Sequence, residues 1–186
     1  MPRLLHEASW KDVEPLVRLI PQYRSLQAVT LSVITTNKIR SLAKYVGLER
    51  LDFAASLYNQ MTQAGIPPFR PIVAKVGSLV RLVVPPMVEI HQGIPVLVDG
   101  THRIWTARKD SLPEVSVISI GGVGLPLPSR TVAWEDVIER SDRYTTEENL
   151  VDFQRALFRP VTTTFNGPAT ILGGYSCLQI PPEETP

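Results

Sequence analysis

The sequence predicts an α+β protein, because helical and strand-like residue patterns occupy different parts of the chain. Residues 1–66 carry apolar side chains mainly at helical spacing. Residues 71–120 change to short apolar runs, rich in β-branched residues and separated by turn residues, which is typical of strands. A helix-capping sequence, Thr145-Thr146-Glu147-Glu148, indicates a further helix near the C-terminus.

This order divides the chain into three segments. We expect an N-terminal helical region at 1–66, a mixed-sheet core at 67–145, and a C-terminal helix with an extended tail at 146–186. A chain of 186 residues is of single-domain size, so the three segments are expected to form one compact unit.

The composition is that of an ordinary globular protein, with 44% hydrophobic and 20% charged residues. Nineteen Lys and Arg against eighteen Asp and Glu leave a net charge of +1, which gives no overall attraction to nucleic acid or acidic membranes. The single cysteine, Cys177, excludes an internal disulfide framework and a cysteine-built metal cluster. The apolar runs are too short to cross a bilayer, and the N-terminus lacks the apolar stretch of a signal peptide. We therefore expect a cytoplasmic protein without a membrane partner.

The N-terminal region contains three segments with helical spacing and one ambiguous segment. The spacing predicts helices at 10–20, 37–46 and 51–64, ended by a proline or a glycine. The β-branched residues of 26–35 are compatible with a strand.

The middle of the chain has the clearest local signals. The turn dipeptide Gly77-Ser78 and the tripeptide His91-Gln92-Gly93 each separate two apolar runs, which predicts two hairpins. The expected elements are strands at 72–76, 79–84, 88–90, 94–98 and 115–120 and a helix at 101–109.

Beyond this core, the pattern predicts a short helix at 134–140 and a longer one at 147–158, opened by the capping sequence. The apolar residues of 161–165 and 169–172 favour short strands. The proline-rich residues 181–186 are expected to form a loose tail.

The strongest functional signal is Asp99-Gly100-Thr101-His102-Arg103, called the turn motif below. An apolar strand leads into a glycine turn and then into the first turn of a helix. Backbone N–H groups and the positive end of the helix dipole attract anions at such a point, and phosphate is the first ligand to expect.

The side chains of the turn motif suit a phosphate ligand. Thr101 either caps the helix or donates its hydroxyl to a phosphate, and Arg103 offers a planar pair of donors. His102 is a donor that can also transfer a proton. Asp99 can orient His102 or hold a metal on a nucleotide, and the long side chain of Arg108 can reach back toward the turn.

A structural interpretation of the same residues stays open. The glycine turn can simply start a helix, while His102 and Arg103 satisfy neighbouring carbonyls or pair with Asp99 without any ligand. Arg108 and Lys109 lie near the end of the expected helix, where the dipole alone explains basic residues.

The turn motif, with Ala107-Arg108 behind it, resembles the signature of the ParB/sulfiredoxin superfamily. In that signature a strand ends in a glycine turn and a basic pair opens a helix. The resemblance covers 71–120 and implies a ParB/sulfiredoxin-like mixed sheet. It also implies that Gly100, Thr101, His102, Arg103 and Arg108 bind a phosphate, with a nucleotide and magnesium as cofactor and a nucleotide or phosphorylated small molecule as partner.

Members of this superfamily carry out different chemistry on one scaffold. They include partition proteins that bind CTP and clamp DNA, a free serine kinase, sulfiredoxin and nucleases. Thr101 stands where sulfiredoxin has its nucleophilic cysteine, which excludes thiolate chemistry. The absence of a helix-turn-helix pattern after the motif disfavours DNA clamping. A phosphotransferase or nucleotide hydrolase is the first expectation, and a nucleic-acid-binding or nuclease module and a non-catalytic interaction protein are the alternatives.

An enzyme of this kind needs a proton acceptor near the phosphates. The candidate catalytic residues are His102, Asp99 and Glu89, the last because its strand precedes that of the motif. The alternative for Glu89 is a charged residue on the solvent face of a hairpin.

Overall fold

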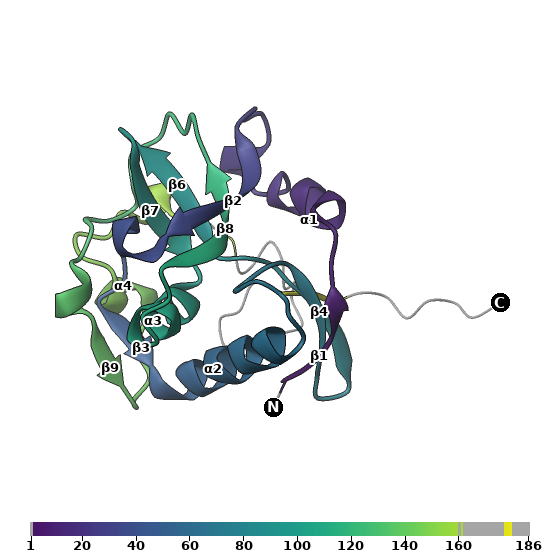
Figure 1. The fold of residues 1–186 in the computed structure, drawn as a ribbon. Helices are drawn as coiled ribbons and strands as arrows, with labels where there is room; N and C mark the ends of the chain where they lie inside the picture. The colour runs from purple at the N-terminus through teal and green to yellow at the C-terminus, as the bar shows by residue number, and fades with distance from the viewer. Residues whose placement is uncertain (1, 160, 162–176, 180–186) are drawn as a thin grey trace.

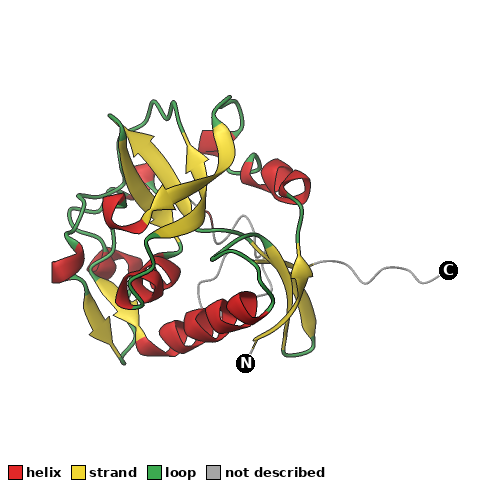
Figure 2. Cartoon of the chain, viewed as in Figure 1, coloured by secondary structure: helices red, strands yellow, loops and turns green. Residues whose placement is uncertain are grey.

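The structure is a computed structural model that describes residues 2–159, 161 and 177–179. Helices and strands are mixed along this part of the chain, with three sheets and four α-helices in the described residues (Figures 1 and 2). The α+β class is therefore confirmed. None of the helices in these ranges has the length and apolar character needed to cross a bilayer.

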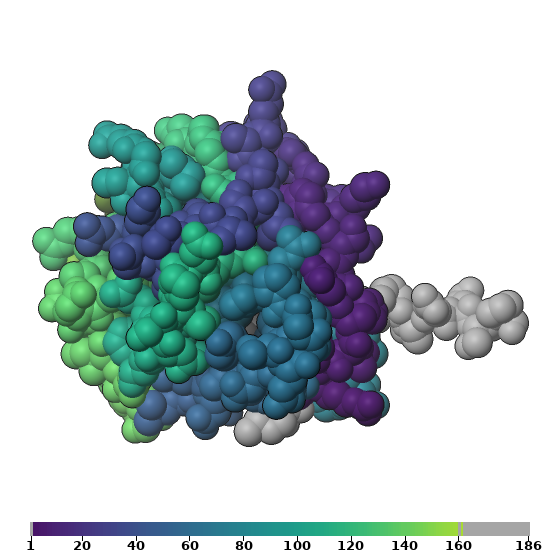
Figure 3. All heavy atoms as spheres, in the orientation of Figure 1, coloured from purple at the N-terminus to yellow at the C-terminus, as the bar shows by residue number. Residues whose placement is uncertain are grey.

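The first sheet has the strand order β1-β4-β5-β10, with all neighbours antiparallel. Val73 and Leu82 on one face pack with Val13 and Val17 of α1, and the opposite face packs against α2. In the space-filling view, the purple N-terminal residues lie against the teal residues of the middle of the chain (Figure 3). The elements are β1 (Pro2–Glu7), α1 (Trp10–Val17), α2 (Leu48–Gln63), β4 (Ile72–Val76), β5 (Leu79–Val83) and β10 (Cys177–Gln179).

The second sheet has the order β2-β8-β6-β7 and is mixed, because β6 runs parallel to β8 while the other pairs are antiparallel. Ile104 and Ala107 of α3 pack with Val88, Val115 and Val117 of this sheet in one apolar cluster. The elements are β2 (Val29–Thr35), β6 (Met87–His91), β7 (Ile94–Asp99), α3 (Thr101–Lys109) and β8 (Glu114–Ile120).

The third sheet is a pair of short strands, and the rest of this part of the chain consists of short turns and a one-turn helix. β3 (Tyr45–Gly47) leads directly into α2 and pairs in parallel with β9 (Ile138–Arg140). The remaining pieces are the 3₁₀ turns Pro21–Tyr23, Thr36–Lys38, Trp134–Asp136 and Arg155–Leu157 and the one-turn helix α4 (Thr146–Asn149).

The expected helical region at 1–66 is only partly helical. The helices expected at 10–20 and 51–64 are confirmed in the main as α1 and α2, but β1 occupies 2–7 and the ambiguous segment is strand β2. A strand forms at 2–7 because its backbone completes the edge of the first sheet beside β4.

The helix expected at 37–46 is wrong. Its apolar residues are buried as the pattern requires, but the backbone bonds to distant segments instead of to itself. The Arg40 N–H donates to the Pro95 carbonyl at 2.9 Å, and the Lys44 N–H donates to the Asn149 carbonyl at 2.8 Å. Tertiary pairing therefore outweighs the helical spacing.

The elements expected between 72 and 120 are confirmed, whereas those expected after 120 are confirmed only in part. The capping sequence forms as expected at Thr145 and Glu148, but the helix expected at 147–158 stops after α4. It stops because Leu150 and Val151 turn into extended bridges with residues 43 and 130. The segment 134–140 splits into a 3₁₀ turn and β9. The strands expected at 161–165 and 169–172 and the tail at 181–186 lie outside the described residues, apart from Val161.

Candidate functional site

The strand–turn–helix geometry expected for the turn motif is confirmed. β7 ends at Asp99, Gly100 adopts a left-handed conformation with φ 93°, and α3 begins at Thr101. A Cβ atom on residue 100 would lie 2.8 Å from the Cβ of Pro86 and 3.0 Å from Nη2 of Arg103. Both the backbone angle and the close approach therefore require glycine.

A cavity of about 240 Å³ opens at this turn. Asp99, Gly100, Thr101 and His102 line it, so it lies at the N-terminus of α3. Other polar residues of its wall come from segments far away in the sequence, namely Tyr45, Arg50, Tyr144, Thr145, Thr146, Asn149 and Arg159.

His102 is buried and holds two helix starts together. Its Nε2 accepts a hydrogen bond from the backbone N–H of Gly47 at 3.0 Å, so the ring proton is assigned to Nδ1. Burial, and then the charges of Arg50 and Arg103, lower the pKa of His102 to about 3. A neutral imidazole whose basic nitrogen is already engaged is suited to positioning the backbone rather than to accepting a substrate proton.

Arg103 is not among the residues that line the cavity. It is 2% exposed, and its guanidinium donates to the Val84 carbonyl and, at 3.2 Å, to the Asp99 carboxylate. This is the arrangement that the structural interpretation of the motif expects. The direct contact with a ligand that the sequence suggested for Arg103 does not follow from this geometry.

Arg108 also lies outside the cavity lining. Its guanidinium stacks over the Trp134 ring at 5.4 Å and lies 3.9 Å from the Glu135 carboxylate. The side chain therefore packs on the outer side of α3 instead of reaching back toward the turn.

Sequence reasoning missed Arg50, which lines the cavity from the first turn of α2. Its charge acts on the neighbouring His102 and Tyr144, because burial raises the pKa of Tyr144 and Arg50 opposes that rise. In the sequence Arg50 looks like any solvated helix residue. Arg50 reaches the turn motif only because the folded chain places β3 and the start of α2 beside the start of α3.

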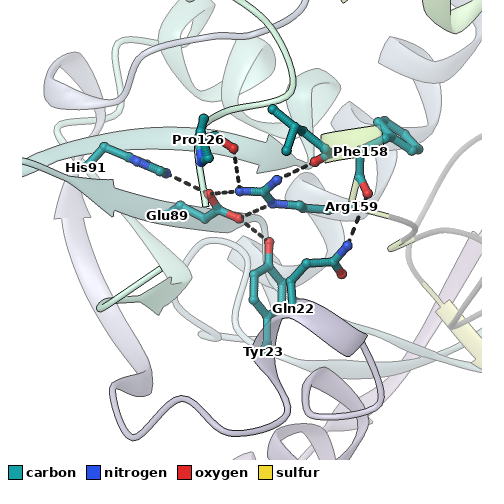
Figure 4. A network of polar contacts seen from close by, with 8 residues as sticks. Gln22, Tyr23, Glu89, His91, Pro126, Phe158 and Arg159 are labelled. Carbon is teal, nitrogen blue, oxygen red and sulfur yellow. Dashed lines mark hydrogen bonds and ion pairs between the residues drawn. The ribbon is translucent and has the colours of Figure 1, made fainter. Parts of the chain in front are cut away.

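Glu89 is neither at the cavity nor on a solvent face. Its side chain is fully buried in a network of polar side chains from three parts of the chain (Figure 4). It accepts hydrogen bonds from Tyr23 at 2.6 Å and from Arg159 at 2.7 and 3.0 Å, and it pairs with His91 at 2.7 Å. Burial alone would raise the pKa of Glu89, but these hydrogen bonds outweigh it and hold the pKa below its usual value.

The Glu89 network nevertheless borders the cavity through Arg159, which is among the lining residues. The guanidinium of Arg159 also donates to the carbonyls of Pro126, at 3.1 Å, and Leu157. Glu89 therefore fixes one wall of the cavity without entering it.

In comparisons with known proteins, the chain matches no family model, no curated protein and no solved structure. The resemblance to the ParB/sulfiredoxin superfamily therefore depends on the turn motif and the elements around it.

Proposed function

We propose that the protein binds a nucleotide or a phosphorylated small molecule in the cavity at the turn motif. The observation that carries the proposal is that the cavity opens on the first turn of α3 with Arg50 in its wall. The first N–H groups of a helix have no acceptor within the helix, and the dipole is positive there. Arg50 adds a full positive charge, so a phosphate group is attracted without help from Arg103.

The rest of the wall favours a nucleotide over a bare phosphate. Tyr45 and Tyr144 lie with ring centroids 5.5 Å apart, and both are partly exposed. Lys44 and Arg140 lie over the Tyr45 ring at 5.2 and 4.7 Å. The Tyr144 ring therefore offers the aromatic face to a base or sugar, and the hydroxyls of Thr145 and Thr146 offer hydrogen bonds. The cavity volume of about 240 Å³ approaches the lower end of the range of about 300–1,000 Å³ for small-molecule sites.

We also propose that the scaffold belongs to the ParB/sulfiredoxin superfamily and that the cavity supports phosphoryl transfer or nucleotide hydrolysis. Of the three residues that the sequence suggested as catalytic, Asp99 and His102 line the cavity. Asp99 is the proton acceptor in this proposal, because His102 is neutral and engaged with Gly47. The net charge of +1 favours a small molecule over nucleic acid.

Isothermal titration with ATP, ADP, CTP and GTP, each with magnesium, tests the binding proposal. We expect at least one nucleotide to bind, and Arg50→Ala to weaken it about tenfold to hundredfold, the scale of a charge-assisted hydrogen bond. The matched control is Arg24→Ala, an exposed arginine outside the cavity lining, which should leave the affinity unchanged.

Two results would overturn the proposal. One is that none of these nucleotides and no inorganic phosphate binds the wild-type chain. The other is equal affinity in wild type and Arg50→Ala. DNA binding with a steep salt dependence, in the absence of nucleotide binding, would favour the nucleic-acid alternative instead.

A further inference from the structure

The second sheet has two edge strands, β7 and β2, and only β7 is covered by other described residues. The edge of β7 bonds to the segment before β3, because the Arg40 N–H donates to the Pro95 carbonyl and the Leu97 N–H donates to the Arg40 carbonyl, each at 2.9 Å. No described residue pairs with the outer edge of β2. In this part of the chain, β2 therefore has an open edge (Figure 1).

The sequence of β2 lacks the features that usually protect an open edge. Proteins blunt such edges with very short strands, charged side chains, proline or a bulge. The seven residues of β2 include no charged residue, proline or glycine, and the strand pairs with β8 without a register shift. By contrast, β1 carries Pro2, Arg3 and a bulge at the edge of the first sheet, and β3, β9 and β10 have three residues each. Among the described strands, β2 is thus a long edge that is ready to pair.

The ladder between β2 and β8 shows which backbone groups face the open edge. Directly after β2, the Thr36 N–H donates to the Pro113 carbonyl at 2.9 Å, which continues the register of β2 with β8. Successive residues of an antiparallel strand alternate between bonding to one neighbour and facing the other side. The even-numbered residues of β2 therefore bond to β8, and the odd-numbered residues Leu31 and Val33 direct their N–H and C=O groups outward.

The side chains along this edge are apolar as well. Val33 is 63% exposed, more than any other large hydrophobic residue in the described part of the chain. Leu31 is partly exposed on the same face of the strand, since side chains two residues apart share a face. An open row of backbone donors and acceptors beside exposed apolar side chains is a template for another strand.

We propose that β2 is a self-association surface, which pairs antiparallel with β2 of a second copy of the chain. The two four-stranded sheets then form one continuous sheet of eight strands. In this pairing a two-fold axis passes beside Ser32, so that Val33 of each copy lies opposite Leu31 of the partner subunit. Both residues direct backbone groups outward, so each such pair exchanges two hydrogen bonds and covers the exposed Val33 side chain.

A second copy fits this edge because β2 is complementary to itself. A two-fold axis places each side chain of the strand opposite another side chain from the same seven residues. None of these residues is charged, so no like charges meet across the interface. The net charge of +1 adds little repulsion between two copies. The proposal does not depend on the function proposed above, because no residue of β2 lines the cavity at the turn motif.

Sedimentation equilibrium of the full chain tests the proposal. One pair of strands makes a small interface, so we expect a monomer–dimer equilibrium in a concentration series that extends to the high micromolar range. Val33→Lys brings two positive charges into the interface and should raise the dissociation constant of the dimer about tenfold or more. The matched control is Ile138→Lys, which changes another apolar residue with 57% exposure, in β9, and should leave the dissociation constant unchanged.

Disulfide trapping tests the register, in a Cys177→Ser background. The axis places residue 32 opposite its own copy at a position without direct hydrogen bonds, where Cα atoms lie about 4.5 Å apart, within the range of a disulfide. Ser32→Cys should therefore give a covalent dimer on oxidation. Thr30→Cys is the control, because its copy lies four residues further along the partner strand, about 13 Å away, and it should stay monomeric.

Three results would overturn the proposal. The first is a wild-type chain that stays monomeric over the whole concentration series. The second is a Val33→Lys variant that folds and dimerises as well as Ile138→Lys. The third, which applies even if Val33→Lys does not fold, is disulfide formation in Ser32→Cys that is no faster than in Thr30→Cys.

Discussion

The His102 imidazole accepts a hydrogen bond from the backbone N–H of Gly47, with 3.0 Å between Nε2 and the backbone nitrogen. Gly47 is the residue before α2, and His102 lies in the first turn of α3. The bond therefore joins the two helix starts that border the cavity, and it requires a neutral imidazole.

The burial of His102, together with the nearby charges of Arg50 and Arg103, makes the stability of the protein depend on pH. The pKa of His102 is about 3 in the folded chain and about 6.5 when unfolded. Between these values the unfolded state binds more protons, so the free energy of unfolding should fall by about 1.4 kcal/mol for each pH unit below 6.5. Above pH 6.5 His102 contributes no slope. Urea unfolding between pH 5 and 8 measures this dependence.

His102→Gln is the matched control for that experiment. Glutamine offers an oxygen to the Gly47 N–H but does not titrate, so the slope between pH 5 and 6.5 should decrease. An unchanged slope in this variant would contradict the assigned role of His102.

Gly100→Ala should destabilise the protein strongly. The φ of 93° costs an alanine about 1–2 kcal/mol, and contact with Pro86 at 2.8 Å forces a further shift. Gly77→Ala is the control, because its φ of 63° gives similar backbone strain with nothing within 4 Å of the added carbon. In urea unfolding, Gly100→Ala should cost about 1–3 kcal/mol more than Gly77→Ala. Equal costs would contradict this prediction, because they would mean that residue 86 moves away from the added methyl group without a loss of stability.

Arg103→Ala should act on stability rather than on ligand binding directly. The substitution removes the guanidinium that donates to the Asp99 carboxylate and to the Val84 carbonyl, and breaking such a buried pair costs about 3–5 kcal/mol. Arg50→Ala should weaken nucleotide affinity directly, because Arg50 lines the cavity. Urea unfolding and titration of both variants distinguish the two arginines. If the Arg103→Ala variant is stable but no longer binds the nucleotide, Arg103 contacts the ligand directly and belongs to the site.

The elements between 72 and 120 could be predicted because their signals are local. Turn residues such as Gly77-Ser78 and the alternation of apolar residues fix these hairpins within a few positions. The helices expected at 37–46 and 147–158 failed for one reason. In both segments the backbone bonds to distant residues, as Lys44 does with Asn149, and no local pattern reports such partners.

The sequence predicts that the turn motif forms part of the candidate site, but it does not predict which other residues surround it. The turn motif does border the cavity, but a helix start sends successive side chains in different directions. The sequence therefore could not show that Arg103 turns inward to Val84 while Thr101 lines the cavity. It also could not show that Arg50 and Tyr144 meet there, since they are far apart in the chain.

The Glu89 network should contribute strongly to stability above the usual pKa of a carboxyl group. Glu89→Gln removes the charge that pairs with buried Arg159, with an expected cost of about 3–5 kcal/mol at pH 7. Tyr23→Phe removes one hydrogen bond to the same carboxylate, with an expected cost of about 1.5–3 kcal/mol. Because the pKa of Glu89 is lowered, its contribution should be lost as pH falls through the acidic range. Urea unfolding at pH 7 and pH 4 checks both costs, and additive effects of the two substitutions would contradict a shared network.

Asp99→Asn should slow turnover more than it weakens binding, if the chain hydrolyses or transfers a phosphoryl group. Asparagine keeps the shape of the side chain next to Arg103 but cannot accept a proton as a carboxylate does. A positioned proton acceptor contributes about 10²–10⁴-fold to rate, whereas the helix start and Arg50 supply the attraction for the ground state. Phosphate release, with the nucleotide that titration identifies, measures the first quantity, and titration of the variant measures the second. Asp110→Asn, an exposed carboxylate at the other end of α3, is the control and should match the wild type. A rate for Asp99→Asn within a few-fold of that control would exclude Asp99 as the proton acceptor and leave the cavity as a binding site alone.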